Sequence, residues 1–246
     1  MKSNKILLGV LGGLGPMSTF YFCELLTQHT QAVSDADHID MLISSRATTP
    51  DRTAFILGKS DLDPLPVMLE EANRLVASGA NLLVIPCNTA HYFYKGLSEQ
   101  VTVPMLNIIK ETVLHIKNLG GSSFGLLATE GTVASRAYEK VCLQHGLTCL
   151  LPSEEQQKKI SSIIYDQIKQ NRPADLSVFL EIAEDLQDRG AERLVLGCTE
   201  LSLLKHQLPA TMPFLDSLEV LAYQTIRACH KKPIGFSKDF EAGGCV

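Results

Sequence analysis

Two cysteines, Cys87 and Cys198, occupy the same place in two similar stretches of this sequence. Segment 78–89 reads SGANLLVIPCNT, and segment 189–200 reads RGAERLVLGCTE. In each stretch a short apolar run typical of a buried strand ends at the cysteine, and polar residues that favour a helix start follow it. Because a thiol is a general acid and its thiolate a general base, the repeat predicts two acid/base groups of one kind.

Two such groups suit a reaction that moves protons on both faces of one carbon. One group removes a proton from one face while the other delivers a proton to the opposite face, which inverts the centre. A helix start after each cysteine is expected to lower the thiol pKa, and its free amides suit a carboxylate. The alternative is that Cys87 and Cys198 are core residues, repeated only because the halves are homologous. Their polar flanks favour the chemical interpretation.

The elements that must position these thiols alternate along the chain. Helical patterns at 65–78 and 175–188 each carry one apolar stripe and end at a glycine. Strand-like runs separate the helical patterns, which is typical of βαβ units and parallel sheets. The expected strands lie near 6–11, 39–44, 82–86, 105–108, 123–128, 148–151, 193–197 and 214–216.

The repeat extends beyond the cysteines, since VPMLN at 103–107 matches MPFLD at 212–216. We therefore predict an α/β fold of two similar lobes, each a parallel sheet flanked by helices, related by pseudo-two-fold symmetry. The first lobe is expected at 1–104 plus 215–234 and the second at 105–214, with a flexible tail at 235–246. Ligands of open α/β sheets bind outside the carboxyl ends of strands, so the active site is expected in the cleft between the lobes.

The net charge and the cysteine spacing limit the kinds of partner and ligand that this protein is expected to bind. A net charge of −5 without any basic run gives no footprint for nucleic acid or an anionic membrane, so a small-molecule partner is expected. The apolar run after the first residues is interpreted as a buried strand rather than a signal peptide, which predicts a cytoplasmic protein. Seven scattered cysteines without a CxxC pair argue against disulfides and structural zinc, and no metal site is expected.

Three further features could contribute to a site. The glycine turn GGLGP at 12–16 is not GxGxxG, and we interpret it as a substrate loop rather than a dinucleotide site. The two arginines of the polar loop 45–53, Arg46 and Arg52, could both be solvated, and Arg52, at the carboxyl end of a strand, is the better anion ligand. His91 is either an orienting group for Cys87 or a packing residue.

Five motifs in order resemble the aspartate racemase branch of the aspartate/glutamate racemase superfamily. They are GGLGPMST at 12–19, PDRT at 50–53, PCNTAH at 86–91, LATEGT at 127–132 and GCTE at 197–200. The resemblance runs from about residue 6 to residue 230. It implies a two-base mechanism without pyridoxal phosphate (PLP) or any other cofactor, a cleft between two α/β lobes, and a homodimer.

The resemblance also implies roles for particular residues. Cys87 and Cys198 match the catalytic thiols, and Arg52 matches the arginine that reads a distal carboxylate. Lys169 resembles a lysine that assists it, although taken alone Lys169 is interpreted as a solvated cation at a helix end. The positions that hold the α-carboxylate and amino group are matched by Asn88, Thr89, Thr129, Thr132 and Thr199.

The expected activity is racemisation of an acidic amino acid, aspartate first and glutamate second. A broad-specificity amino-acid racemase is the nearest alternative, and maleate isomerisation or hydantoin racemisation is more distant. From other classes, a non-catalytic amino-acid-binding protein would keep the cleft without the chemistry, and a PLP enzyme would show the visible absorbance of that cofactor.

Overall fold

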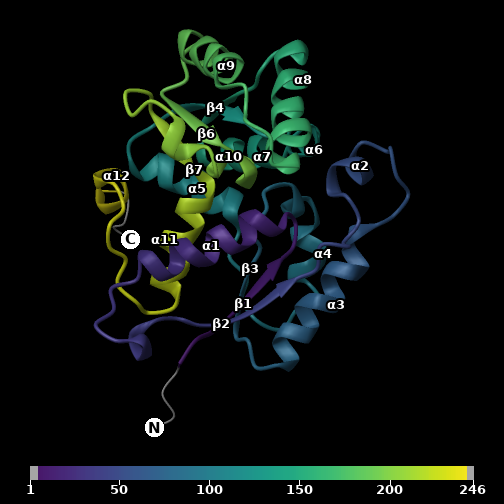
Figure 1. Ribbon diagram of the computed structural model, residues 1–246, viewed down its shortest axis with the longest axis vertical. Coiled ribbons are helices and arrows are strands. Elements are labelled where there is room, and N and C mark those ends of the chain that lie inside the picture. The colour runs from purple at the N-terminus through teal and green to yellow at the C-terminus, as the bar shows by residue number, and fades with distance from the viewer. Residues whose placement is uncertain (1–4, 243–246) are drawn as a thin grey trace.

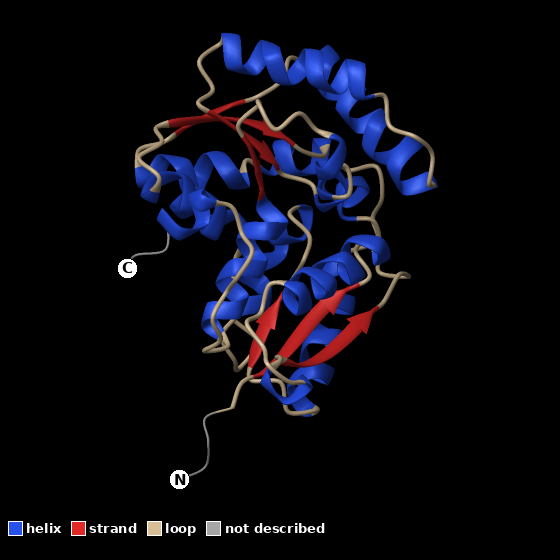
Figure 2. Cartoon of the chain, turned by 60° about the vertical axis from the view of Figure 1, so that its left-hand side comes forward, coloured by secondary structure: helices blue, strands red, loops and turns tan. Residues whose placement is uncertain are grey.

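The computed structural model describes residues 5–242 and contains two parallel sheets that lie towards opposite ends of the molecule (Figures 1 and 2). The strands of the first sheet, in spatial order, are β2 (Asp40–Ser45), β1 (Leu7–Gly12) and β3 (Leu82–Val84). Those of the second sheet are β5 (Thr148–Leu150), β4 (Ser123–Leu127), β6 (Arg193–Leu196) and β7 (Phe214–Asp216).

The two sheets share one topology. The central strands β1 and β4 are each paired in parallel on both sides, which explains why both are continuous apolar runs. Beyond β3, Met105 forms a single parallel bridge with Leu83, at the place where β7 pairs with β6 in the second sheet. The predicted α/β fold of two similar lobes is therefore confirmed.

The expected strand at 105–108 is wrong beyond Met105. Asn107 instead begins a helix, because its side-chain oxygen accepts hydrogen bonds from the amides of Ile109 and Lys110. An asparagine that bonds to the backbone in this way favours a helix N-terminus over a strand. At the equivalent place in the second half, Asp216 ends β7 and caps the next helix through the amide of Leu218.

Helices cover the sheets, and the expected helices at 65–78 and 175–188 are present as α3 (Pro64–Ala77) and α9 (Leu176–Asp188). The remaining longer helices are α1 (Pro16–Gln28), α5 (Ile108–Asn118), α7 (Ala137–His145), α8 (Glu154–Ser162) and α11 (Ser217–Ala228). The short ones are α2 (Arg52–Ile56), α4 (Tyr94–Ser98), α6 (Glu130–Ser135), α10 (Thr199–Ser202) and α12 (Lys238–Ala242). The 3₁₀ helices are η1 (Asp35–Asp37), η2 (Thr89–Phe93), η4 (Ile168–Gln170) and η5 (Lys205–Gln207), and η3 (Ile163–Gln167) is a π-helix.

Helices α5 and α11 join the two halves. Helix α5 follows the first sheet yet packs on α7, and α11 follows the second sheet yet packs on α1, while α5 and α11 also pack on each other. Figure 1 shows α1, α5 and α11 lying between the two sheets. One apolar cluster consequently spans both halves and includes Val10 of β1 and Leu126 of β4. The exact lobe boundaries, 1–104 plus 215–234 and 105–214, remain a prediction.

The segment 235–242 differs from the flexible tail expected at 235–246. Phe240 of α12 is buried, and its ring packs against those of His115, Tyr223 and Phe236. Aromatic burial of this kind outweighs the glycine-rich composition that suggested a loose end. Residues 243–246, the rest of that prediction, lie outside the described residues. Among residues 5–242, no helix has the length and apolar character needed to cross a membrane.

Candidate active site

Cys87 and Cys198 lie at equivalent places in the two halves and line the same pocket. Cys87 follows β3 and precedes η2, whereas Cys198 follows β6 and precedes α10. Only 6% of Cys87 and 4% of Cys198 is exposed to solvent. The pocket is nearly closed, with a cavity volume of about 10 Å³, which is the space of about one water molecule.

The surroundings raise the pKa of both thiols, opposite to the expectation from the helix starts. Burial raises the pKa of Cys87, and the positive charge of Arg52 offsets part of this rise. Burial and then the negative charge of Glu200 raise the pKa of Cys198 well above its ordinary value. The helical segments after the cysteines have only five and four residues, so their amides lower these pKa values less than burial raises them.

Arg52 begins α2 and is buried, and backbone oxygens hold its guanidinium in place. Nη1 donates to the carbonyls of Thr49 and Pro50 at 3.2 and 2.9 Å, and Nη2 donates to that of Leu14 at 3.0 Å. Its Nε is buried and has no hydrogen-bond partner among the described residues. A buried N–H of this kind favours a bound acceptor such as a carboxylate oxygen.

Three threonine hydroxyls from both halves meet at the pocket, where Thr89 and Thr129 line the wall and Thr132 bonds to both from outside the lining. Thr89 of η2 lies 2.9 Å from both Thr129 and Thr132, and the last two lie 3.0 Å apart, measured between Oγ1 atoms. Thr199, next to Cys198, has a buried hydroxyl without a hydrogen-bond partner among the described residues. The expected positions for the substrate's polar groups are thus brought together, because hydroxyls both donate and accept hydrogen bonds.

Asn88 lines the pocket, but its side chain bonds into the core. Its Nδ2 donates to Ser217 Oγ at 2.9 Å, and its Oδ1 accepts from the Tyr138 hydroxyl at 2.7 Å. Ser217 in turn donates to the carbonyl of Leu196 at the end of β6. The asparagine side chain therefore links the loop after β3 to the second half of the chain.

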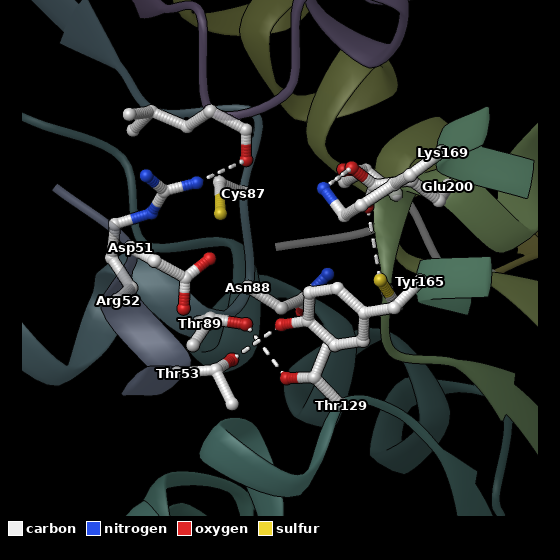
Figure 3. A pocket seen from close by; sticks show the side chains of 13 residues that line it. Asp51, Arg52, Thr53, Cys87, Asn88, Thr89, Thr129, Tyr165, Lys169 and Glu200 are labelled. Atoms are coloured by element: carbon white, nitrogen blue, oxygen red, sulfur yellow. Dashed lines mark hydrogen bonds and ion pairs between the residues drawn. The ribbon is translucent and has the colours of Figure 1, made fainter. Parts of the chain in front are cut away.

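Lys169 lies in η4 on the opposite wall from Arg52, where it forms an ion pair with Glu200 (Figure 3). The other oxygen of the Glu200 carboxylate accepts a hydrogen bond from the Cys198 thiol at 3.0 Å. Figure 3 shows Arg52 beside Cys87 on one side of the pocket, with Lys169 beside Glu200 on the other. The lysine expected to assist Arg52 is thus engaged with a carboxylate of its own wall.

Sequence reasoning missed two residues of this wall, Glu200 and Tyr165. The Tyr165 hydroxyl donates to Thr53 Oγ1 at 2.7 Å, which ties η3 to α2 across the pocket. For Glu200 a signal existed in the repeat, since Glu200 aligns with Thr89 and the two halves differ there in charge. The residues around Tyr165 in the sequence gave no sign that it lines the pocket, because its position there depends on how α2 packs against η3.

His91 supports the loop that carries Cys87. Its Nδ1 lies 2.8 Å from the Cys87 carbonyl oxygen, and its Nε2 accepts from the amide of Ile108 at 3.2 Å. Nδ1 is then the protonated nitrogen that donates to the carbonyl. Burial lowers the pKa of His91 to about 4, so the ring is neutral near pH 7. His91 thus orients the backbone of Cys87 and contributes no charge to the pocket.

Arg46, the other arginine of the polar loop, lies outside the pocket. It forms ion pairs with Glu70 and Glu71 of α3 at 2.6 and 2.8 Å. The preference for Arg52 as the residue of the site therefore agrees with where the two side chains lie.

Two similar parallel sheets that enclose one pocket define the two-lobed architecture of aspartate and glutamate racemases. The chain belongs to the Asp/Glu/hydantoin racemase family, whose model matches residues 11–225. It superposes on the aspartate racemase of Picrophilus torridus with a TM-score of 0.81 and 26% identity, over 98% of this chain and 100% of that one.

Curated relatives from the family support the same assignment. The chain is 25% identical over 224 residues to the broad-specificity amino-acid racemase RacX of Bacillus subtilis, covering 89% of this chain and 96% of the relative. It is 27% identical over 153 residues to the glutamate racemase of Persephonella marina, covering 61% of this chain and 58% of the relative. The resemblance inferred from the five motifs is confirmed at the level of the family.

Proposed function

We propose that this protein is a cofactor-independent racemase of acidic amino acids, with aspartate as the first substrate and glutamate as the second. The observation that carries the proposal is the pair of buried thiols, one from each half of the repeat, that line one pocket. Arg52 on the Cys87 side supplies a buried N–H that has no hydrogen-bond partner within residues 5–242, which suits a distal carboxylate.

The proposed reaction is a transfer of two protons. In one direction the Cys198 thiolate removes the α-proton of the L enantiomer, and the Cys87 thiol donates a proton to the opposite face of the resulting carbanion. The pair then holds its single proton on Cys198 instead of Cys87, and the D enantiomer leaves. The reverse direction begins with Cys87 as the thiolate, so a turnover neither consumes nor releases a net proton.

The polar residues of the pocket are assigned to the substrate's charged groups. The hydroxyls of Thr89, Thr129, Thr132 and Thr199 are proposed to hold the α-carboxylate and the amino group. Because the Asn88 side chain already bonds to Ser217 and Tyr138, we assign Asn88 to holding the loop of Cys87 in place. Arg52 is proposed to bind the distal carboxylate. Lys169 is proposed to act on the pocket indirectly, through its ion pair with Glu200.

A broad-specificity amino-acid racemase is the second candidate, since RacX matches almost the whole chain. The two candidates differ in how much the distal carboxylate matters. A racemase of acidic substrates depends on Arg52, whereas a broad-specificity enzyme also accepts side chains that leave this guanidinium unpaired.

The test is incubation of the purified protein with single enantiomers of the common amino acids, followed by chiral chromatography. Racemisation of aspartate or glutamate at least about tenfold faster than that of neutral or basic amino acids supports the first candidate. Comparable rates for many side chains favour the second. Binding without any change of enantiomer, in protein with both thiols reduced, would instead favour a non-catalytic amino-acid-binding protein.

The cytoplasmic location and the homodimer expected from the resemblance are also proposals. Size-exclusion chromatography with light scattering tests the dimer, with a mass of twice 26.9 kDa as the expected result. A single 26.9 kDa species across micromolar concentrations contradicts it.

A further inference from the structure

The two thiols of the pocket have different neighbours although the repeat gives them equivalent positions. The Cys198 thiol donates to Glu200 at 3.0 Å, and the second oxygen of that carboxylate pairs with Lys169. At the aligned position in the first half stands Thr89, a neutral residue whose hydroxyl bonds to other threonines. The two halves therefore have equivalent backbone positions at 89 and 200 but differ there in charge.

Glu200 is held tightly in its position. Only 8% of its side chain is exposed, and Gly15 of the glycine turn lies against it, such that a Cβ added there would come within 3.0 Å of Oε1. With one oxygen on Lys169 and the other on Cys198, the carboxylate spans the distance between the cation and the thiol. A charge buried in this arrangement acts strongly on its neighbours, because little water screens it.

The other ionisable groups around the thiols differ between the two sides. Lys169 of η4, Tyr165 of η3 and Cys87 face Cys198 in addition to Glu200. For Cys87 the main favourable charge is the guanidinium of Arg52, with Glu200 and Lys169 acting from farther across the pocket. A cation thus favours the thiolate at Cys87, and a directly bonded carboxylate favours the thiol at Cys198.

We propose that Glu200, anchored by Lys169, is a positioning residue that holds the shared proton on Cys198 when the pocket is empty. The resting protein then forms its thiolate at Cys87. This inference rests on the proposed racemisation for its consequence. The enzyme is ready for the enantiomer whose α-hydrogen faces Cys87, and the opposite enantiomer requires that the proton first move from Cys198 to Cys87.

The experiment measures the titration of Cys198 directly, without relying on activity. In a Cys87→Ser background, thiolate formation at Cys198 is followed by ultraviolet absorbance against pH, using the Cys87→Ser/Cys198→Ser protein as the blank. Glu200→Gln is expected to lower the midpoint by about one to three pH units, since it removes a like charge within hydrogen-bond distance. Lys169→Met is expected to move the midpoint in the opposite direction, because it removes a cation.

A matched control is available in the Glu219–Lys205 pair of α11 and η5. Glu219 forms a similar ion pair, with 15% of its side chain exposed, but does not line the pocket. Glu219→Gln removes a carboxylate from a lysine in the same way, so it is expected to leave the Cys198 midpoint unchanged. Circular dichroism of each variant confirms that the fold is retained.

Two results would overturn the inference. One is a Glu200→Gln midpoint equal to or above that of the parent. The other compares the two single cysteine variants. The proposal requires that Cys87, measured in Cys198→Ser, titrate at a lower pH than Cys198, measured in Cys87→Ser, and the reverse order contradicts it. A Cys198 midpoint that shifts as expected in a protein without racemase activity would refute the proposed function and leave the role of Glu200 standing.

Discussion

At the scale of single residues, the proposed preference for acidic substrates depends on how Arg52 is held. Three backbone carbonyls orient its guanidinium, so little side-chain entropy is lost when a carboxylate binds to it. The unpartnered Nε is already desolvated in the empty pocket. A substrate with a distal carboxylate satisfies this N–H, whereas an apolar side chain leaves it unpaired at a cost of about 1–3 kcal/mol.

Arg52→Ala is therefore expected to lower kcat/KM for aspartate by about a hundredfold or more, because it removes charged hydrogen bonds of about 3 kcal/mol. The value for alanine should fall much less. Steady-state rates for both substrates measure the ratio. Arg46→Ala is the control, since Arg46 pairs with α3 outside the pocket and should leave the ratio unchanged. Equal losses for aspartate and alanine in Arg52→Ala would contradict the assignment.

Each thiol is expected to exchange the α-hydrogen of only one enantiomer. Cys87→Ser should allow deuterium from heavy water into L-aspartate without forming D-aspartate, because Cys198 can still remove and return a proton on its own face. Cys198→Ser should do so with D-aspartate. Proton NMR of the α-hydrogen, with each variant and each enantiomer, measures this.

The outcomes separate the mechanism from its stereochemistry. Exchange with the two enantiomers interchanged overturns only the assignment of faces, whereas racemisation at the full rate by either single variant excludes the two-thiol mechanism.

At the scale of elements, the sequence predicted most strands because buried parallel strands are continuous apolar runs. It failed at 105–108, where Asn107 caps α5 and only Met105 pairs with the sheet. The thiols were located by the repeat, but their raised pKa values were not predicted. The burial of the thiols depends on how closely α2, η3 and α10 pack around the pocket. A sequence pattern does not predict the distances between these elements.

Helix α5 should make the fold sensitive to acid through His115. Burial lowers the pKa of His115 to about 4, and neither ring nitrogen has a hydrogen-bond partner among the described residues. The unfolded chain takes up this proton near pH 6.5, so the stabilisation is complete above that pH and is lost as the pH falls towards 4. His91 behaves in the same direction.

His115→Phe should therefore remove about 2 kcal/mol of the stability that the protein loses between pH 7 and pH 5. Urea unfolding at both pH values measures the difference. His206→Gln, at an exposed position, should leave the loss at its original size. An unchanged loss in His115→Phe would show that this histidine does not titrate on unfolding.

At the scale of the whole molecule, the proposed chemistry needs only the chain itself. In the proposed mechanism the two thiols of the pocket supply both proton transfers, and in residues 5–242 no three His, Cys, Asp or Glu side chains are grouped to hold a metal ion. Activity is expected to survive exhaustive dialysis against a chelator, in protein without PLP absorbance. Alkylation of Cys87 and Cys198, located by mass spectrometry, should abolish it. Full activity of protein alkylated at both would refute the thiol mechanism.

The exchange of α5 and α11 between the halves limits how a substrate can enter. A wide hinge motion that swings the sheets apart would expose the apolar cluster shared by Val10, Leu126 and the two helices, at about 25 cal/mol for each Å² uncovered. Neither α2 nor the η3–η4 segment contributes a residue to that cluster, and moving them apart breaks the Tyr165–Thr53 hydrogen bond. We therefore expect the pocket to open at this mouth, while the two sheets that carry the thiols keep their relative positions.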